Sequence, residues 1–578
     1  MEDKAMGAGS SAQGSAKGKS NDTTSKRSAP MSSSVRRMQR FDTKVDSGWQ
    51  MYVRYGLSVV MHVVCLGYIV HMMHAGGILD IIKSYYDATM PWVHPCGLLE
   101  SKEYIILSER IVSRKGTVAG GIHVRGGMIA GTFFGKREMN ESYVVKNLVG
   151  SKTVEILNYG NSVVGPGLID VHVHMNDPGR PEWETMHQAT QAAAAGGVTM
   201  VVDMPLNSDP VTTTKSRLKE KIRIGSSSSF VQVGFWGGLV PENAHRPRAL
   251  KALVNAGAFG FKAFMAPSGI DDFEKVSISD IEAALPYIRD LDVPLLVHAE
   301  VVDQETTSNI PTEGSNPKQY STWMASRPPE MERKAVQQLI RALEGLDTKE
   351  KKHFKVHIVH IADAQALALI ADAKKRQLPI SVETCPHYLL FADKMIPEQA
   401  TEYKCAPPIR DATNRDALRR AVLTGDIDSL SSDHSPSPAY MKDSGDFIKA
   451  WGGISGIQYS LPALWQSLSD MQPDVSPFVL HKVFSEYPAS LLGLRHLKGK
   501  IRDGYHADLV IWNPEEDADT SVKACYQSQK LTPYIGTTLK GKVVATIVRG
   551  SMVFDAGMGV SAKACSMSLT RGALRKEK

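Results

Sequence analysis

The sequence has few cysteines and little net charge. Its 578 residues include only six cysteines, which lie far apart and form no CxxC pair, at positions 65, 96, 385, 405, 525 and 565. This pattern indicates neither a zinc ribbon nor a disulfide scaffold. The formal net charge is only +6, and much of it lies in the N-terminal tail, so a nucleic-acid-binding role has little support. No long internal repeat is evident.

The N-terminal region lacks a normal hydrophobic pattern. Residues 1–54 are rich in Ser, Gly, Lys and Arg, which predicts a disordered basic tail. The stretch 55–79 contains no Asp, Glu, Lys or Arg, and it has the length of a helix that spans a bilayer. It also contains histidines and glycines, so an amphipathic or transit-like extension is the alternative.

A single-pass anchor at 55–79 would have a consequence for location. The basic residues before it would keep the tail cytosolic and place the C-terminal part in a lumen, such as that of the endoplasmic reticulum. The cytoplasm, or an organelle reached by an N-terminal transit segment, is the alternative location.

From residue 165 onward, short apolar runs alternate with helical stretches. Such runs are typical of parallel strands buried on both faces. The predicted strands are 168–172, 198–204, 230–236, 259–265, 293–298, 355–360, 379–384 and 427–433. Helices are predicted at 184–195, 279–291, 330–343, 364–375 and 414–423. Eight strand-plus-helix units predict a TIM (β/α)8 barrel of the α/β class, since the competing doubly wound sheet normally has fewer strands.

Chemically unusual residues follow the ends of these strands, where the catalytic residues of a TIM barrel lie. His172 and His174 are two residues apart, so on a strand both imidazoles point to one side. Lys262, His298 and Asp433 occupy corresponding positions on later strands.

Three further histidines lie near the strand ends. Only one of His357 and His360 should face the mouth, and His360 is nearer the strand end, so we interpret His357 as structural. His434 either supports the site or packs in the core.

These residues suit a metal centre. Imidazole and carboxylate ligands fit zinc, although manganese, cobalt and iron also use them. Lys262 lies in an apolar strand, where burial can leave its amine neutral, and a neutral amine can react with carbon dioxide to give a carbamate that bridges two metals. A lysine that extends to the surface is the alternative. Asp433 is the strand-end acid suited both to metal binding and to proton transfer, so the residues predict metal-assisted hydrolysis.

The order His-x-His, Lys, His, His, Asp resembles the amidohydrolase superfamily, and in particular its cyclic amidase branch of dihydroorotases, dihydropyrimidinases (hydantoinases) and allantoinases. This resemblance implies a TIM barrel over 166–484 and a small β-sandwich built from both flanks (100–165 and 485–556). The residues outside it at 557–578 are predicted to form a basic tail. Relatives are often homotetramers, so a homo-oligomer is expected.

The resemblance also implies a role for each ligand. His172 and His174 would bind a buried metal, and His298 and His360 a more exposed one. Carbamylated Lys262 would bridge the two metals, which are expected to be zinc. Asp433 would bind metal and act as the acid and base.

Finer motifs distinguish the substrate classes. Asn176 replaces an arginine typical of dihydroorotases, and Pro267 replaces a tyrosine typical of hydantoinases. The loops 177–184, 204–208, 405–411, 432–436 and 451–458 resemble those of allantoinases. The resemblance therefore implies hydrolysis of the cyclic amide bond of allantoin, a small molecule, to give allantoate in purine catabolism. A hydantoinase is the alternative, and a non-catalytic scaffold of the same fold is a third interpretation.

Substrate contacts are predicted in the loops. By analogy with the branch, Ala406 and Gly453 would hold the hydantoin edge through their backbones. Asn207, Arg180 and Ser435 would contact the ureido arm. Loop capping or turn formation is the alternative for each of these side chains.

Overall fold

The computed structural model describes residues 96–99, 101–144, 154–304, 315–347, 351–565 and 568–571. The predicted basic tail (1–54) and the candidate membrane anchor (55–79) lie outside the described residues, so both stay predictions. Within the described ranges, no helix is both long and apolar enough to cross a membrane.

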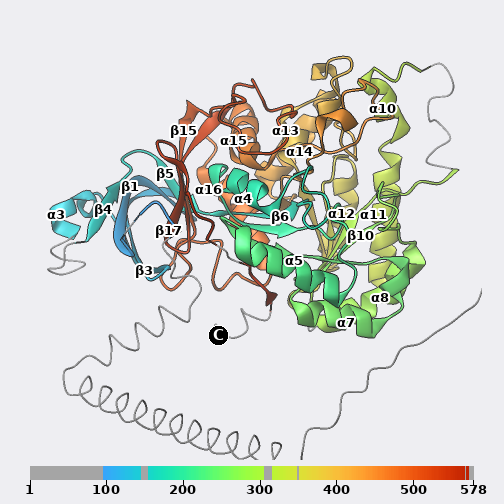
Figure 1. Cartoon of the computed structure of the whole chain (residues 1–578), viewed down its shortest axis with the longest axis horizontal. Helices are drawn as coiled ribbons and strands as arrows, with labels where there is room; N and C mark the ends of the chain where they lie inside the picture. The colour runs from blue at the N-terminus through green and yellow to red at the C-terminus, as the bar shows by residue number, and fades with distance from the viewer. Residues whose placement is uncertain are drawn as a thin grey trace, which may run out of the picture. The chain divides into compact units, whose positions relative to one another are not determined.

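The central part of the chain is the predicted barrel (Figure 1). Its strands are β6 (Leu168–Val173), β7 (Val198–Asp203), β8 (Gln232–Phe235), β9 (Gly237–Gly238), β10 (Phe261–Phe264), β11 (Leu295–His298), β12 (Val356–Ile358), β13 (Ile380–Thr384) and β14 (Ser429–Leu430). They form two hydrogen-bonded sheets, β6-β7-β8 and β9 to β14. A parallel bridge between Val173 and His434 connects the first strand to the segment after the last, which closes the ring. Every residue in these strands is buried, as expected for strands covered on both faces.

The third predicted strand is the one that differs from expectation. It is divided at Trp236, so that β8 pairs with β7 and β9 pairs with β10. Glycine at 238 is required there, because a Cβ atom would lie 2.6 Å from the ring of Phe273. The Phe273 ring therefore packs directly against β9.

The five predicted helices are present within two residues of their expected bounds. They are α4 (Met186–Ala195), α8 (Ile278–Leu291), α11 (Glu330–Glu344), α12 (Ala366–Lys375) and α14 (Ala412–Thr424). Helix α4 begins after Thr185, which exchanges hydrogen bonds with Gln188 in a capping box. It ends at Gly196 and Gly197, the second of which has a positive φ of 81°. Local capping signals thus fix where this helix starts and stops.

Both flanks of the barrel contribute to one nine-stranded sheet. Its strands are β1 (Glu103–Ser113), β2 (Gly116–Arg125), β3 (Met128–Phe134), β4 (Glu155–Asn158), β5 (Val163–Pro166), β15 (Leu509–Asp517), β16 (Lys540–Val548), β17 (Ser551–Asp555) and β18 (Gly559–Val560). Strand β5 pairs with β1 on one side and β15 on the other, which joins the two flanks. Figure 1 shows the blue N-terminal strands beside the dark red C-terminal strands.

A disulfide joins Cys96 to Cys565 across a sequence separation of 469 residues. Next to it, the Ser561 hydroxyl donates to the Cys96 carbonyl, and the Leu98 amide donates to the Met552 carbonyl at 2.7 Å. The spacing of the cysteines did not indicate this bond, because its two partners come from opposite ends of the described chain.

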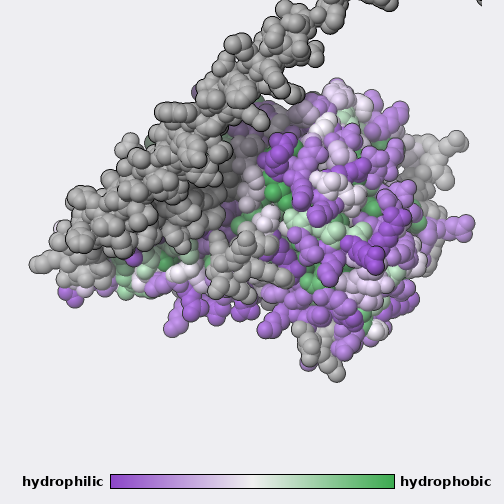
Figure 2. Space-filling view, turned by 60° about the horizontal axis from the view of Figure 1, so that its bottom comes forward, coloured by the Kyte–Doolittle hydropathy of each residue, from purple (hydrophilic) through white to green (hydrophobic). Residues whose placement is uncertain are grey.

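The outer surface is largely hydrophilic on the face that Figure 2 shows, with hydrophobic residues in small areas between the polar ones. Single exposed apolar residues are normal on protein surfaces. The informative feature of this chain is therefore the polar cluster inside the barrel.

Candidate metal centre

All six predicted metal ligands lie at the carboxyl ends of barrel strands. His172 and Lys262 lie within β6 and β10, and His298 is the last residue of β11. His174, His360 and Asp433 follow β6, β12 and β14 within three residues. Because these strands are parallel and form one closed ring, their ends meet at one mouth.

Asp433 lies between the two histidines of the first strand. Its Oδ1 is 3.2 Å from His172 Nε2 and 3.4 Å from His174 Nε2. Two ligand atoms bound to one tetrahedral zinc at roughly 2.0–2.2 Å would be separated by roughly 3.3–3.5 Å. The three side chains therefore have the spacing of ligands to a common ion.

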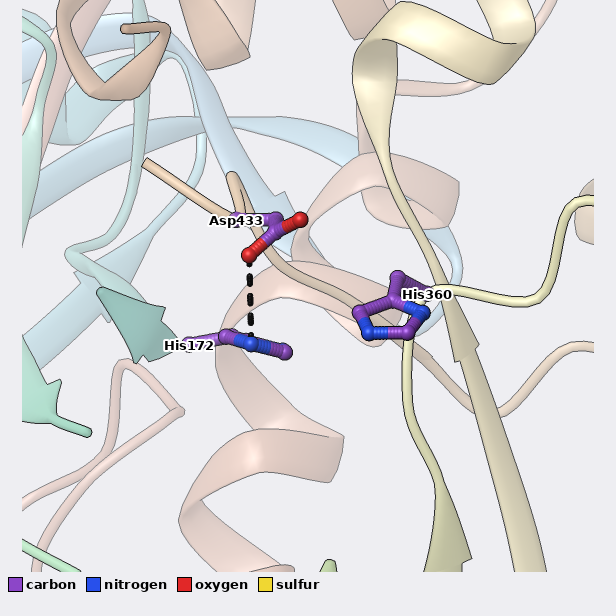
Figure 3. Close-up of side chains that lie close together, drawn as sticks. All are labelled: His172, His360 and Asp433. Atoms are coloured by element: carbon purple, nitrogen blue, oxygen red, sulfur yellow. Dashed lines mark ion pairs between the residues drawn. The ribbon is translucent and has the colours of Figure 1, made fainter. Parts of the chain in front are cut away.

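His360 and His298 extend the cluster. The ring centroids of His360 and His172 are 5.3 Å apart, and those of His298 and His360 are 4.6 Å apart. Ligand atoms of His172, His360 and Asp433 lie within 4.8 Å of one another. Figure 3 shows the His360 ring facing the space beside the His172–Asp433 ion pair.

Lys262 also reaches this cluster. It is 0% exposed, and its Nζ lies 3.4 Å from His172 Nε2 and 4.8 Å from the centre of the Phe264 ring. Burial lowers the pKa of this amine to about 8. The predicted alternative, a lysine that extends to the surface, is therefore wrong.

The backbone is unusual at two of the predicted ligands. His360 has a φ of 39° and Asp433 a φ of 47°, in the left-handed region that residues other than glycine seldom adopt. Such conformations cost about 1–3 kcal/mol each and cluster at functional sites. The fold thus holds both side chains in directions that an unstrained strand end would not provide.

Burial favours the neutral form of the four histidines of the cluster. Burial lowers the pKa of His172, His174, His298 and His360 below the ordinary value for histidine. A neutral imidazole has a free lone pair, which is the form that binds a metal ion. Among the described residues, the Nδ1 atoms of His174 and His360 have no hydrogen-bond partner.

Two buried glutamates hydrogen-bond to histidines of the predicted ligand set, and sequence reasoning missed both. Glu383 accepts from His172 Nδ1 at 2.7 Å, and Glu300 lies 2.6 Å from His298 Nε2. Burial alone would raise the pKa of Glu300, but Arg327 and His298 hold it well below its usual range. Glu383 sits in β13, so its place at a strand end was the one signal that could have identified it.

The other two strand-end histidines make hydrogen bonds away from the ligand atoms. His357 lies 3.0 Å from Glu383 and 2.8 Å from the Ser381 hydroxyl. His434 pairs with the buried Glu184, and its Nδ1 accepts from the Gly456 amide at 3.1 Å. His357 is thus linked to His172 through Glu383, whereas the His434 side chain bonds to Glu184 and Gly456.

The predicted substrate contacts fall in two groups. Ser435 and Gly453 are neighbours, since a Cβ atom on Gly453 would lie 2.6 Å from the Ser435 carbonyl. Asn207, with a φ of 71°, lies in the loop after β7, and its carbonyl accepts from Arg180 at 3.2 Å. Ala406 precedes a cis proline and is not connected to either group by a hydrogen bond among the described residues.

Asn176 and His387 are among the further buried side chains that lack hydrogen-bond partners within the described part of the chain. Both amide atoms of Asn176 and both ring nitrogens of His387 are unpaired. Burial lowers the pKa of His387 to about 4. Unpaired buried polar atoms are rare in folded proteins, so each calls for an explanation.

The donor set fits divalent metals. It contains neutral imidazoles, one carboxylate only 12% exposed, and unpaired imidazole nitrogens at the mouth of the barrel. Imidazole and carboxylate are the ligands of catalytic zinc sites, and carboxylates behind the histidines are the usual orienting groups.

Comparisons with known proteins agree with this arrangement. Residues 163–553 match the model of the amidohydrolase family. The chain is 43% identical over 487 residues to "Allantoinase" from Arabidopsis thaliana, an alignment that covers 82% of this chain and 92% of that protein. It is 43% identical over 468 residues to "Probable allantoinase" from Oryza sativa subsp. japonica, covering 79% and 89%. The structure of "L-Hydantoinase (Dihydropyrimidinase) from Arthrobacter aurescens" superposes with a TM-score of 0.72 at 28% identity, covering 82% of this chain and 100% of that one.

Proposed function

The chain belongs to the amidohydrolase family, and from this premise we propose that it is an allantoinase, a hydrolase that opens the hydantoin ring of allantoin to give allantoate. Similarity to curated allantoinases over about four fifths of the chain supports the substrate. The observation that carries the chemistry is the convergence of six potential ligands from five strand ends on one mouth.

The proposed centre binds two divalent metal ions, with zinc as the expected metal. His172 and His174 would hold one ion, and His298 and His360 the other. When bound, such ions supply a nucleophile from water near neutral pH and polarise the carbonyl under attack. Glu383 and Glu300 would keep His172 and His298 in the tautomer and orientation that ligation needs.

Lys262 is proposed as a carbamate. The neutral amine forms an N–C bond with carbon dioxide and loses a proton, which leaves an anionic group able to bridge two ions. Its complete burial supports this role, as does the lack of a carboxylate ion pair to its amine among the described residues. A free ammonium at this position would be costly.

Asp433 is proposed as the acid and base. Its carboxylate would accept a proton from the attacking water and deliver it to the ring nitrogen as the amide bond breaks. The positive φ at Asp433 supports a fixed placement for this group at the mouth. Ser435, two residues after Asp433, and its neighbour Gly453 remain the proposed contacts to the hydantoin edge and arm, together with Ala406 and Asn207.

Hydrolysis assays on the purified full-length protein test the function. We expect allantoin to be the preferred substrate over hydantoin and dihydrouracil, with about two metal ions per chain by elemental analysis. Preference for dihydrouracil would instead indicate a dihydropyrimidinase. A metal-free, inactive protein would indicate a scaffold.

The proposal also covers the cellular compartment and the oligomeric state of the protein. Disulfides persist in oxidising compartments, so the Cys96–Cys565 bond supports a lumenal position for the folded part of the chain. The candidate anchor at 55–79 would deliver it there. A homo-oligomer, with a tetramer as the family suggests, is proposed on resemblance alone and can be measured by light scattering.

A further inference from the structure

We propose that Asn176 determines substrate choice by pairing its carboxamide with the ureido arm of the substrate. This inference rests on the proposed function, because the ureido arm is what distinguishes allantoin from an unsubstituted hydantoin.

Asn176 lies two residues beyond His174, just after strand β6 ends at Val173. Met175, between them, belongs to the core that also contains Met186 of α4. His172 and His174 instead meet Asp433, so Asn176 directly follows the candidate metal ligands of the first strand along the chain.

The backbone on both sides of Asn176 is fixed. The Met175 amide donates to the Asp203 carboxylate at 2.8 Å, and the Asn176 amide donates to the Glu184 carbonyl at 3.1 Å. The Asn176 carbonyl in turn accepts from the Arg180 amide at 3.1 Å. A side chain held on such a rigid segment is well placed to recognise a ligand, since little freedom is lost on binding.

The side chain itself is unsatisfied. Asn176 is 0% exposed, yet neither its Oδ1 nor its Nδ2 has a hydrogen-bond partner among the described residues. Leaving a buried amide unpaired is unfavourable, and native proteins rarely do so without a ligand or a water to complete it.

A buried asparagine elsewhere in the same barrel shows the contrast. Asn243 accepts from the Val240 amide at 3.1 Å and donates to the Gly238 carbonyl at 2.9 Å. The Asn243 amide thus pairs with the protein backbone, whereas the Asn176 amide is available to pair with a ligand.

The chemistry of the free amide matches the ureido group. A carboxamide presents one acceptor and one donor side by side, and the terminal CONH2 of a ureido arm presents the complementary pair. A substrate that lacks the arm would leave the buried amide unpaired, so the site would reject it. Sites that read a polar group in this way discriminate strongly against analogues without it.

The test combines one substitution with one change of ligand. Asn176→Leu removes both polar atoms at similar volume. We expect kcat/KM for allantoin to fall about 10- to 100-fold, mainly through KM. The inhibition constant of unsubstituted hydantoin, measured by competition against allantoin, should change less than about 2-fold. Asn176→Ser, which is smaller and keeps one hydroxyl, provides a second variant should the leucine disturb folding.

The controls separate recognition from folding. Asn243→Leu removes a buried amide that the fold uses, so it should lower the thermal unfolding temperature while leaving the allantoin-to-hydantoin ratio unchanged. Metal content is measured for every variant.

Three outcomes have distinct meanings. Equal loss for both ligands, or no loss with allantoin, would overturn the assignment of Asn176. A wild-type protein that fails to hydrolyse allantoin would instead overturn the proposed function. Selective loss with allantoin alone supports both.

Discussion

Two buried lysines at opposite ends of the barrel are in contrasting environments. Lys498, near the start of β8, donates to the Asp508 carboxylate and to the Gln232 side chain. Asp508 also accepts from the Arg549 amide at 2.8 Å. Lys262, at the mouth, has a histidine nitrogen and an aromatic ring beside its amine, and no carboxylate pairs with it among the described residues.

The two environments show how a polar cluster whose groups pair with one another, around Lys498, differs from one with unsatisfied groups, around Lys262. Burial alone would raise the pKa of Asp508, but Lys498 and His506 hold it below its ordinary value, so charges at the base are balanced within the fold. At the mouth, imidazole and amide atoms have no hydrogen-bond partner among the described residues, and two predicted ligands adopt left-handed backbone conformations. Polar groups left unpaired at a cost to stability are ready to pair with a ligand.

The largest expected effect is on catalysis, from a substitution of Lys262 at the mouth of the barrel. Lys262→Ala should lower kcat/KM for allantoin by about 10³-fold or more, or roughly 4 kcal/mol of barrier, and should reduce bound metal because the proposed bridge is gone. Thermal unfolding should change little, since no ion pair is lost. Elemental analysis and steady-state assays on the same sample check this. Full activity with two metals retained would reject the carbamate.

The proton-transfer role of Asp433 comes next. Asp433→Asn should reduce turnover about 10²–10⁴-fold, because an amide cannot carry the proton, while the protein still folds. Stopped-flow or steady-state turnover provides the measurement. Asp443→Asn, on an exposed residue nearby in sequence, is the matched control and should be fully active. A variant at 433 with near-normal turnover would contradict the role.

At the base, the expected effect is on stability instead. Lys498→Ala leaves the Asp508 carboxylate buried and unpaired, so the free energy of unfolding should fall by about 3–5 kcal/mol. Urea unfolding measures this, and activity per folded molecule should be preserved. Were turnover to collapse in folded protein, the distinction between the two clusters would be lost.

The smallest effect concerns the covalent link outside both clusters. Replacing Cys96 and Cys565 by Ser should cost about 2–4 kcal/mol of stability, because the bond restricts the unfolded chain. A reductant should lower the unfolding temperature of the wild type and leave that of the double variant unchanged. If the reductant affects both equally, the link is not the cause.

Much of the fold could be predicted from local patterns. Runs of buried apolar residues indicated all eight strand positions, and capping residues such as Thr185 and Gly197 marked helix ends. The division of the third strand at Trp236 was not predicted, because it is defined by which neighbouring strand each half pairs with, β8 with β7 and β9 with β10.

The candidate ligands could also be predicted from local patterns in the sequence. Each follows a strand, and parallel strands bring their ends together whatever the loops between them contain. The glutamates that hydrogen-bond to the predicted ligand histidines could not be predicted from the sequence. Glu383 is 211 residues from the histidine that it orients, and nothing in its own neighbourhood indicates that partner.

The sequence alone determined the repeating strand and helix units and the residue types at the strand ends, since both depend on short-range periodicity. Only the tertiary structure decided which of those residues are paired, which are strained, and which are left unpaired like Asn176. Pairing depends on contacts between residues far apart in the chain, and these exist only once the ring of strands has closed.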